Sequence, residues 1–149
     1  MRAVIQRVSK ASVSVAGEVV GQIENGLLVF LGVQLDDTQM DVDYIVKKSV
    51  GLRVFEDKDG RMNLDVTASR GSVLAISQFT LLGDVRRGKR PSFTAAEEPV
   101  EAQQLYEAYC RSVAEQGVRV EQGVFQADMQ VALVNDGPVT IMLDSRKTF

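Results

Sequence analysis

The chain has 149 residues, which suits one domain, and its contents of 45% hydrophobic and 25% charged residues are ordinary for a soluble globular protein. The formal net charge of −3 gives no overall attraction for nucleic acid, so such a role would need a local basic patch. The single cysteine excludes an intramolecular disulfide and a CxxC metal site, and the absence of histidine excludes Ser-His-Asp and Cys-His catalysis.

Strand patterns fill the first third of the chain. Apolar and polar residues alternate between residues 4 and 15, and Ala16-Gly17 predicts a turn. Gly26–Leu35 is an apolar run short enough for a fully buried strand. The N-terminal alternation is unlike a secretory signal, and no apolar run approaches the roughly 20 residues of a membrane span. We therefore expect a cytoplasmic protein without a membrane partner, with a single domain over residues 1–149.

A helix and a hairpin follow. Residues 36–38 (Asp-Asp-Thr) supply candidates for the N-cap of a helix that reaches Leu52. Residues 53–64 predict a hairpin that turns at Asp57–Gly60. This turn lacks the ligand spacing of an EF-hand calcium loop, so we interpret it as an ordinary surface turn.

The second half again alternates strand and helix. Ser72–Leu82 is predicted to be another buried strand, and a polar, basic loop follows it. Pro99 opens the longest helix, for which Gly117 is the expected stop, and residues 118–143 return to strand. The order of these elements predicts an α/β fold with more sheet than helix.

Cys110 lies at the edge of the apolar face of the longest predicted helix. No histidine is present to activate the thiol, so we interpret it as a buried and inert structural residue.

Four cations, Arg86, Arg87, Lys89 and Arg90, stand within five residues of an acidic chain. A charge run of this kind is ordinarily a solvated loop. Here it follows a buried strand and precedes Phe93, so the scaffold would hold it in place, and phosphates are its natural partners. Both interpretations remain open at this level.

Polar residues interrupt the strand predicted to end at Leu82. Ser77, Gln78 and Thr80 surround Phe79, and a strand between two apolar layers would need partners for such side chains. The segment is either an ordinary strand end or the floor of a pocket. A pocket would use the Thr80 hydroxyl and the local backbone N–H groups as donors to an oxyanion.

Val131–Leu143 would read as one long strand if Asn135-Asp136-Gly137-Pro138 did not stand in its middle. Pro138 has no N–H to donate, so we expect a tight turn between two strands. About 5–6% of X-Pro bonds in folded proteins are cis, and tight turns are where they concentrate. The Gly-Pro pair is either a simple turn or a rigid tip that can enter a neighbouring cavity.

Several of these motifs together resemble the D-aminoacyl-tRNA deacylase family, over essentially the whole chain. Ser77-Gln78-Phe79-Thr80-Leu81 and Asn135–Thr140 are similar to the two signature motifs of that family, and residues 2–8, 88–93 and 125–129 also match. Gln126 departs from the pattern, because the family has a small residue there. We expect this departure to change the shape of the pocket and the substrate preference, and not the class of reaction.

The resemblance implies a compact subunit with mixed, mainly antiparallel sheets in β/β/α layers and two main helices, acting as a homodimer. It implies that Gly137-Pro138 forms a cis peptide that enters the active site of the partner subunit and rejects L-aminoacyl groups. The partner molecule would be the 3′ end of D-aminoacyl-tRNA, with no DNA, metal or cofactor. The implied catalytic residues are Ser77, Gln78, Phe79 and Thr80, the tRNA-binding residues are Arg86, Arg87, Lys89 and Arg90, and the supporting residues are Arg7, Met129, Asn135, Asp136, Val139 and Thr140.

Two chemical routes are open for the ester. Thr80 could act as a nucleophile, although no histidine stands ready to take its proton. We favour backbone N–H groups near Phe79 and Thr80 that hold the oxyanion, while water or the ribose hydroxyl carries the proton. A steric filter of this kind would also admit glycine. The alternatives are a non-catalytic dimeric RNA-binding protein that uses the basic loop, and a thiol- or metal-dependent hydrolase, which the lone cysteine and missing histidine disfavour.

Overall fold

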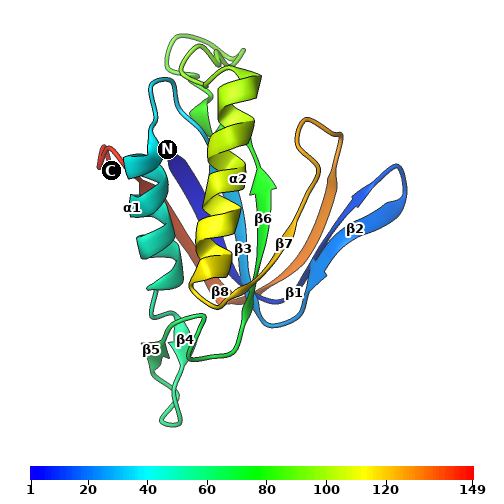
Figure 1. Cartoon of the computed structure of the whole chain (residues 1–149), viewed down its shortest axis with the longest axis vertical. Helices are drawn as coiled ribbons and strands as arrows, with labels where there is room; N and C mark the ends of the chain where they lie inside the picture. Colours follow the sequence, from blue (N-terminus) through cyan, green and yellow to red (C-terminus); the bar gives the residue numbers. More distant parts are fainter.

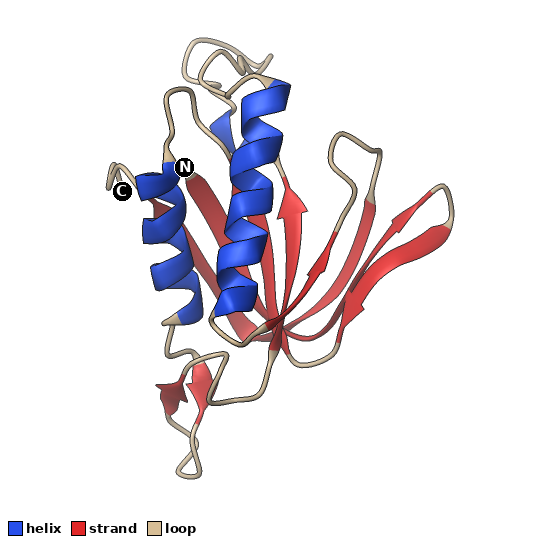
Figure 2. Cartoon of the chain, viewed as in Figure 1, coloured by secondary structure: helices blue, strands red, loops and turns tan.

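A computed structural model describes all residues from 1 to 149 (Figures 1 and 2). Its elements in chain order are β1 (Arg2–Val15), β2 (Glu18–Ile23), β3 (Gly26–Gly32), α1 (Gln39–Val50), β4 (Phe55–Glu56), β5 (Met62–Leu64), β6 (Ser72–Ser77), the 3-10 helix η1 (Phe79–Leu82), α2 (Pro99–Glu115), β7 (Arg119–Gln122) and β8 (Gln130–Asp144).

Six strands form one sheet in the order β2-β1-β3-β6-β7, and β8 pairs with β1. The pairs of β1 with β2, β3 and β8 are antiparallel, whereas β3–β6 and β6–β7 are parallel. Parallel neighbours need long crossovers, and the segments that contain α1 and α2 supply them. The predicted α/β fold, with a mixed, mainly antiparallel sheet and two main helices, is confirmed.

The sheet has a core on each of its faces. The larger core lies between the sheet and the two helices, which cover one side in Figure 1. The smaller core lies where the sheet curls back toward a nearly closed barrel. Along β3, Leu27, Val29 and Leu31 belong to the first core and Leu28 to the second, because successive side chains point to opposite faces. Burial on both faces explains why this strand is apolar throughout, as predicted.

Both helices begin at residues that the sequence offered as starts. Of the three N-cap candidates, Thr38 caps α1, and its side chain accepts from a backbone N–H in a capping box completed by Asp41. Asp37 is buried instead and accepts from the backbone N–H of Gln34 at 2.7 Å. Pro99 is the first residue of α2, and the chain leaves that helix through Gly117, whose φ is +82°.

The expected strand Ser72–Leu82 is wrong beyond Ser77. The Gln78 N–H still bonds the Leu31 carbonyl of β3 at 2.8 Å, but β3 itself ends one residue later, at Gly32. Past that point the chain has no neighbouring strand on that side, so its N–H groups turn to local carbonyls and form η1. The end of the partner strand therefore ends this strand.

The expected turn at Asn135–Pro138 is also wrong, because β8 continues through it as one strand. Gln6 of β1 faces Thr140 while Val8 faces Asn135, so a step of two residues along β1 is matched by five along β8. The surplus residues of β8 form a bulge of several residues. Pro138 lies in this bulge, so its missing N–H removes no hydrogen bond from the strand pairing. The Gly137–Pro138 peptide bond is cis. The expected strand over residues 118–143 is divided by a loop between β7 and β8.

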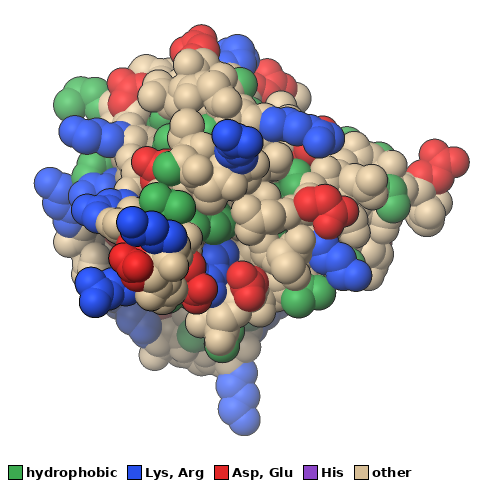
Figure 3. Space-filling model, turned by 90° about the horizontal axis from the view of Figure 1, so that it is seen from below, with side chains coloured by type: hydrophobic (Ala, Val, Ile, Leu, Met, Phe, Trp, Pro, Cys, Tyr) green, Lys and Arg blue, Asp and Glu red, His purple; other side chains and the backbone are tan.

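The β4–β5 hairpin confirms the surface turn at Asp57. Its carboxylate accepts from the backbone N–H groups of Asp59 and Arg61 at 2.9 and 3.1 Å, and these bonds lower the pKa of Asp57. Figure 3 views the molecule from this end, where basic and acidic side chains are interspersed. No helix of the structure is both long enough and apolar enough to cross a membrane.

Candidate active site

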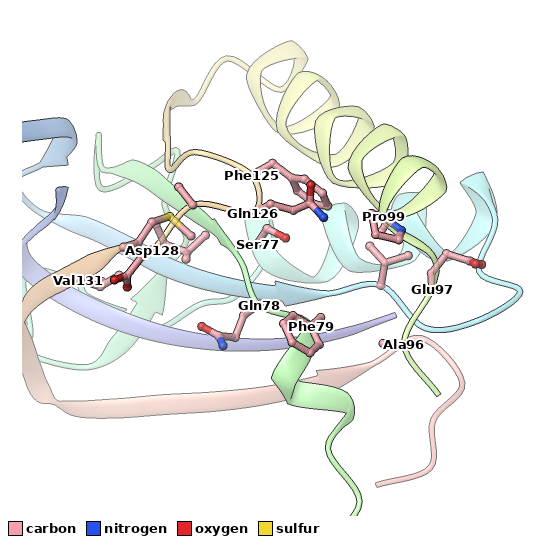
Figure 4. A pocket seen from close by; sticks show the side chains of 15 residues that line it. Ser77, Gln78, Phe79, Ala96, Glu97, Pro99, Phe125, Gln126, Asp128 and Val131 are labelled. Atoms are coloured by element: carbon pink, nitrogen blue, oxygen red, sulfur yellow. The ribbon is translucent and has the colours of Figure 1, made fainter. Parts of the chain in front are cut away.

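A cavity of about 570 Å³ opens at the end of β6, and most of the residues that line it are hydrophobic (Figure 4). It lies beyond the carboxyl end of a parallel strand, the usual place for ligands in open α/β sheets. Three separate segments meet there: the end of β6 with the start of η1, the β7–β8 loop, and the start of α2. They contribute residues 76–79, 125–129, 96, 97, 99 and 102, together with Val33 and Val131.

The predicted site segment divides at the cavity edge. Ser77, Gln78 and Phe79 line the cavity, but Thr80, on the exposed side of η1, does not. The Gln78 carboxamide donates a hydrogen bond to the Thr80 hydroxyl. Phe79 is 54% exposed at the mouth, with its ring edge-on to Phe93 at a centroid distance of 5.1 Å. Residues 77–79 therefore form part of the cavity floor. Thr80 lies outside the cavity and contacts this floor only through its hydrogen bond with Gln78.

The β7–β8 loop forms the opposite wall and is tied to β6. The Ala75 carbonyl accepts both the Tyr106 hydroxyl at 2.9 Å and the Gly123 N–H at 3.1 Å. A side chain at Gly123 would meet the Met129 sulfur at 2.6 Å, so glycine is needed for Met129 to pack here. Phe125 lies 6.1 Å from Tyr106, ring centroid to ring centroid. These contacts fix the wall to the scaffold.

The start of α2 closes the cavity, a wall that no sequence motif predicts. The Glu97 carboxylate accepts the backbone N–H groups of Asp36 at 3.0 Å and Glu98 at 2.9 Å, which fixes the residues before Pro99. Asp128, the other acidic residue of the lining, lies in Figure 4 near Val131, away from Pro99. No local signal could have identified this wall, because only the α2 crossover brings it beside β6.

The bulge of β8 lies outside this cavity and is braced by Arg7. The Arg7 side chain is 6% exposed, and its Nε donates to the Asp136 carbonyl at 3.0 Å and lies 3.4 Å from an Asp136 carboxylate oxygen. Its Nη1 donates to the Val54 carbonyl at 2.5 Å. Gly137 has φ +124°, and a Cβ there would lie 2.7 Å from Arg7 Nη2. Neither Gly137 nor Pro138 lines the cavity of its own chain.

Further side chains of the second motif hold the bulge from within. The Asn135 amide donates to the Val139 carbonyl at 3.0 Å, across the base of the bulge. Val139 is buried and packs in the larger core, and Thr140 accepts from the Gln6 amide at 3.1 Å. Met129, grouped with these residues in the sequence, lines the cavity instead.

The basic loop is anchored beside the cavity mouth. Asp84 and Ser92 pair across its ends, and Phe93 then packs on Phe79. Arg86 donates two hydrogen bonds to the Asp84 carboxylate, one to each oxygen, and this bidentate contact lowers the pKa of Asp84 to about 2. Arg87, Lys89 and Arg90 are exposed and form no salt bridge.

Cys110 is buried in the larger core, as predicted, and burial raises the pKa of its thiol to about 12. At neutral pH it is therefore a protonated apolar side chain. No group of three or more His, Cys, Asp or Glu side chains is arranged to hold a metal ion.

Comparisons with known proteins agree over nearly the whole chain. The family model described as D-Tyr-tRNA(Tyr) deacylase matches residues 4–144. Curated proteins named D-aminoacyl-tRNA deacylase from Koribacter versatilis and Thermotoga petrophila are 58% and 57% identical over 149 residues, with 100% of this chain and of each relative covered.

Two solved structures share the fold. One, named "c-Myc DNA Unwinding Element Binding Protein", is 40% identical, with a TM-score of 0.91 and coverage of 97% of this chain and 98% of that one. The other, described as a probable eukaryotic D-amino acid tRNA deacylase, has a TM-score of 0.82 at 17% identity, covering 95% and 97%. Because the family match and the relatives extend over both motifs and the whole fold, the resemblance is confirmed: the chain belongs to the D-Tyr-tRNA(Tyr) deacylase family.

Proposed function

We propose that this chain hydrolyses the ester of D-aminoacyl-tRNA, and of glycyl-tRNA, and so removes wrongly charged amino acids before translation. The observation that carries the proposal is the cavity at the end of β6, whose polar edge is the Ser77–Phe79 segment of the first family motif. The substrate would be the 3′ end of charged tRNA in the cytoplasm, and the residues of the site would act without a metal or cofactor.

The Gly137-Pro138 bulge is proposed as a chiral filter that acts in the partner subunit of a homodimer. It projects from β8, an edge strand, and does not line the cavity of its own chain, so it is free to enter another. Arg7 restrains it by donating to the Asp136 carbonyl, and a second bond, to the Val54 carbonyl outside the bulge, fixes the guanidinium itself. Backbone atoms at such a tip leave room for hydrogen on one side of Cα and none for a side chain, which rejects L-aminoacyl groups by clash and accepts glycine.

Backbone donors near Phe79 and Thr80 are proposed to hold the oxyanion. The first N–H groups of a 3-10 helix have no acceptor within it, and η1 begins at Phe79. A water oxygen attacks the ester carbonyl, the bond to the ribose oxygen breaks, and the proton that the water gives up passes to that ribose oxygen, which leaves a free amino acid and a free tRNA end. One well-placed donor contributes about 3–4 kcal/mol to such a step. Because Thr80 lies outside the cavity lining and is bonded to Gln78, we assign it a positioning role.

The exposed cations of the basic loop are proposed to bind tRNA phosphates. Arg87, Lys89 and Arg90 have no acidic partner, whereas Arg86 is already neutralised by Asp84. Replacing Lys89 and Arg90 with glutamine should weaken tRNA binding and reduce its dependence on salt, by about one unit of slope for each phosphate that is no longer bound. Arg86→Gln is the matched control and should change the slope less.

The deciding experiment compares hydrolysis of D-tyrosyl-tRNA and L-tyrosyl-tRNA by the purified chain, with and without chelator. Release from the D-ester alone, in both conditions, supports the proposal. Cleavage of both esters would retain the hydrolase and refute the filter. Binding of tRNA without turnover would favour the alternative of a non-catalytic, dimeric RNA-binding protein.

Gly137→Ala tests the filter directly. The added methyl group would press on Arg7 and Val139, at 2.7 and 3.0 Å, so the tip must shift and L-tyrosyl-tRNA should become a substrate. Gly60→Ala is the control, since it adds a methyl at another positive φ with open space around it. If Gly137→Ala kept full discrimination, the filter would have to be placed elsewhere.

A further inference from the structure

Gln126 has a backbone conformation that its side chain does not favour. Its φ is +62°, in the left-handed region where glycine is the default and where asparagine and aspartate are the commonest exceptions. Glutamine gains nothing locally in this region, because its longer side chain does not bond its own backbone as asparagine does. Strained positions of this kind cluster at ligand sites. The position of Gln126 relative to the cavity therefore bears on its function.

Gln126 lies in the wall of the cavity, in a loop whose backbone is hydrogen-bonded before and after it. Gly123, three residues earlier, donates its N–H to Ala75 at 3.1 Å, and Ala127 donates to Val124 at 3.2 Å. Gln126 lines the cavity, and in Figure 4 its side chain extends across it toward Pro99. The Gln126 side chain is exposed, and its carboxamide forms no hydrogen bond within the chain. A donor and an acceptor are thus presented to the cavity without a protein partner.

The other polar groups of the lining are already engaged or are simpler. The Gln78 carboxamide is bonded to Thr80, and the Glu97 carboxylate accepts two backbone N–H groups. Ser77 offers one hydroxyl, and Asp128 offers a carboxylate, which accepts hydrogen bonds but donates none. Gln126 is therefore the lining residue that presents an adjacent donor and acceptor in one plane, the pattern that matches the polar edge of adenine.

We propose that Gln126 is a specificity-determining residue whose carboxamide hydrogen-bonds the terminal adenine base of tRNA, an inference that rests on the proposed function. The aminoacyl side chain varies between substrates, so a fixed polar contact to it would help some and penalise others. The terminal adenosine is the same in every tRNA, and only a constant partner makes a strained polar residue useful for all of them. Phe125 and Met129, on the same wall, supply apolar surface for the face of the base.

The test uses the full chain and two forms of D-tyrosyl-tRNA. One ends in adenosine, and the other ends in purine riboside, which lacks the 6-amino group. The wild type should prefer adenosine by about 3- to 10-fold in kcat/KM, the size of effect expected for a hydrogen bond between uncharged groups. Gln126→Leu keeps the size of the side chain without its polar atoms, so the ratio should fall to about 1. The loss should lie mainly in KM.

Two further variants separate the contact from the strain. Gln126→Gly removes both, so it should raise the thermal midpoint of unfolding while its adenosine preference also falls to about 1. Ala16→Gly, at another non-glycine position of positive φ (50°) in an exposed turn, should change stability in the same direction and keep the wild-type ratio. A ratio near 1 in the wild type, or a preserved ratio in Gln126→Leu, would overturn the assignment. Failure of the wild type to cleave either tRNA would overturn the proposed function itself.

Discussion

Replacing Arg7 with methionine should destabilise the protein by about 3 kcal/mol, because it removes two hydrogen bonds from a buried guanidinium to backbone carbonyls. Hydrogen bonds from a charged donor contribute about 1.5–3 kcal/mol each, and Arg7 makes two, to Asp136 and Val54. The ion pair with the half-exposed Asp136 carboxylate adds about 0–1 kcal/mol. Apolar packing of methionine offsets part of this loss. A domain of ordinary stability, about 5–15 kcal/mol, would remain folded.

Urea denaturation, monitored by circular dichroism, measures the change in the free energy of unfolding. Asp136→Asn is the matched control, since it removes the carboxylate and keeps the backbone carbonyl that Arg7 binds, so its cost should stay below about 1 kcal/mol. The folded Arg7→Met variant should also cleave L-tyrosyl-tRNA, because its tip is no longer held. A loss within about 1 kcal/mol of the control, with discrimination intact, would refute the bracing role.

Three other outcomes are expected. Gly26→Ala should abolish folding or solubility, because its Cβ would fall far inside contact distance of the Ser72 carbonyl in the parallel β3–β6 pair, as a solubility and denaturation test would show. Cys110 should react with a thiol reagent at pH 8 only at the rate of unfolding, given its raised pKa of about 12, and fast labelling of the folded protein would contradict its burial. Since the pKa of Asp84 is lowered to about 2, its contact with Arg86 stabilises the fold above pH 3.8 and is lost as the pH falls toward 2. The stability difference between wild type and Asp84→Asn should therefore shrink over that window in acid titrations.

The sequence alone determined the elements whose cause is local. Alternation located β1, continuous apolar residues located β3, and Pro99 with Gly117 bounded α2, because each signal acts within a few residues of the structure it specifies. The same holds for Cys110, whose place on an apolar helix face made it a core residue. The two motifs identified the family for a similar reason, since each is a short and specific string.

Only the tertiary structure decided where elements stop and what they enclose. Apolar residues return at Leu81 and Leu82, so the pattern predicts a strand to Leu82, but β3 ends at Gly32 and leaves the segment after Ser77 without a partner. Asn135–Pro138 reads as a turn, yet the long β1 keeps β8 paired on both sides of it, so the surplus residues bulge outward. Strand ends and bulges depend on which backbone lies alongside, and that neighbour is distant in the chain.

The cavity is the clearest case of a feature that the local sequence does not predict. Ser77 and Gln78 could be predicted as its edge, but Glu97 and Pro99 carry no sign of a site in their own sequence. They reach the cavity because α2 is the crossover between the parallel strands β6 and β7, which returns its first turn to the end of β6. A site assembled from three segments is a property of their packing, so the sequence determined the pieces and the fold determined which of them meet.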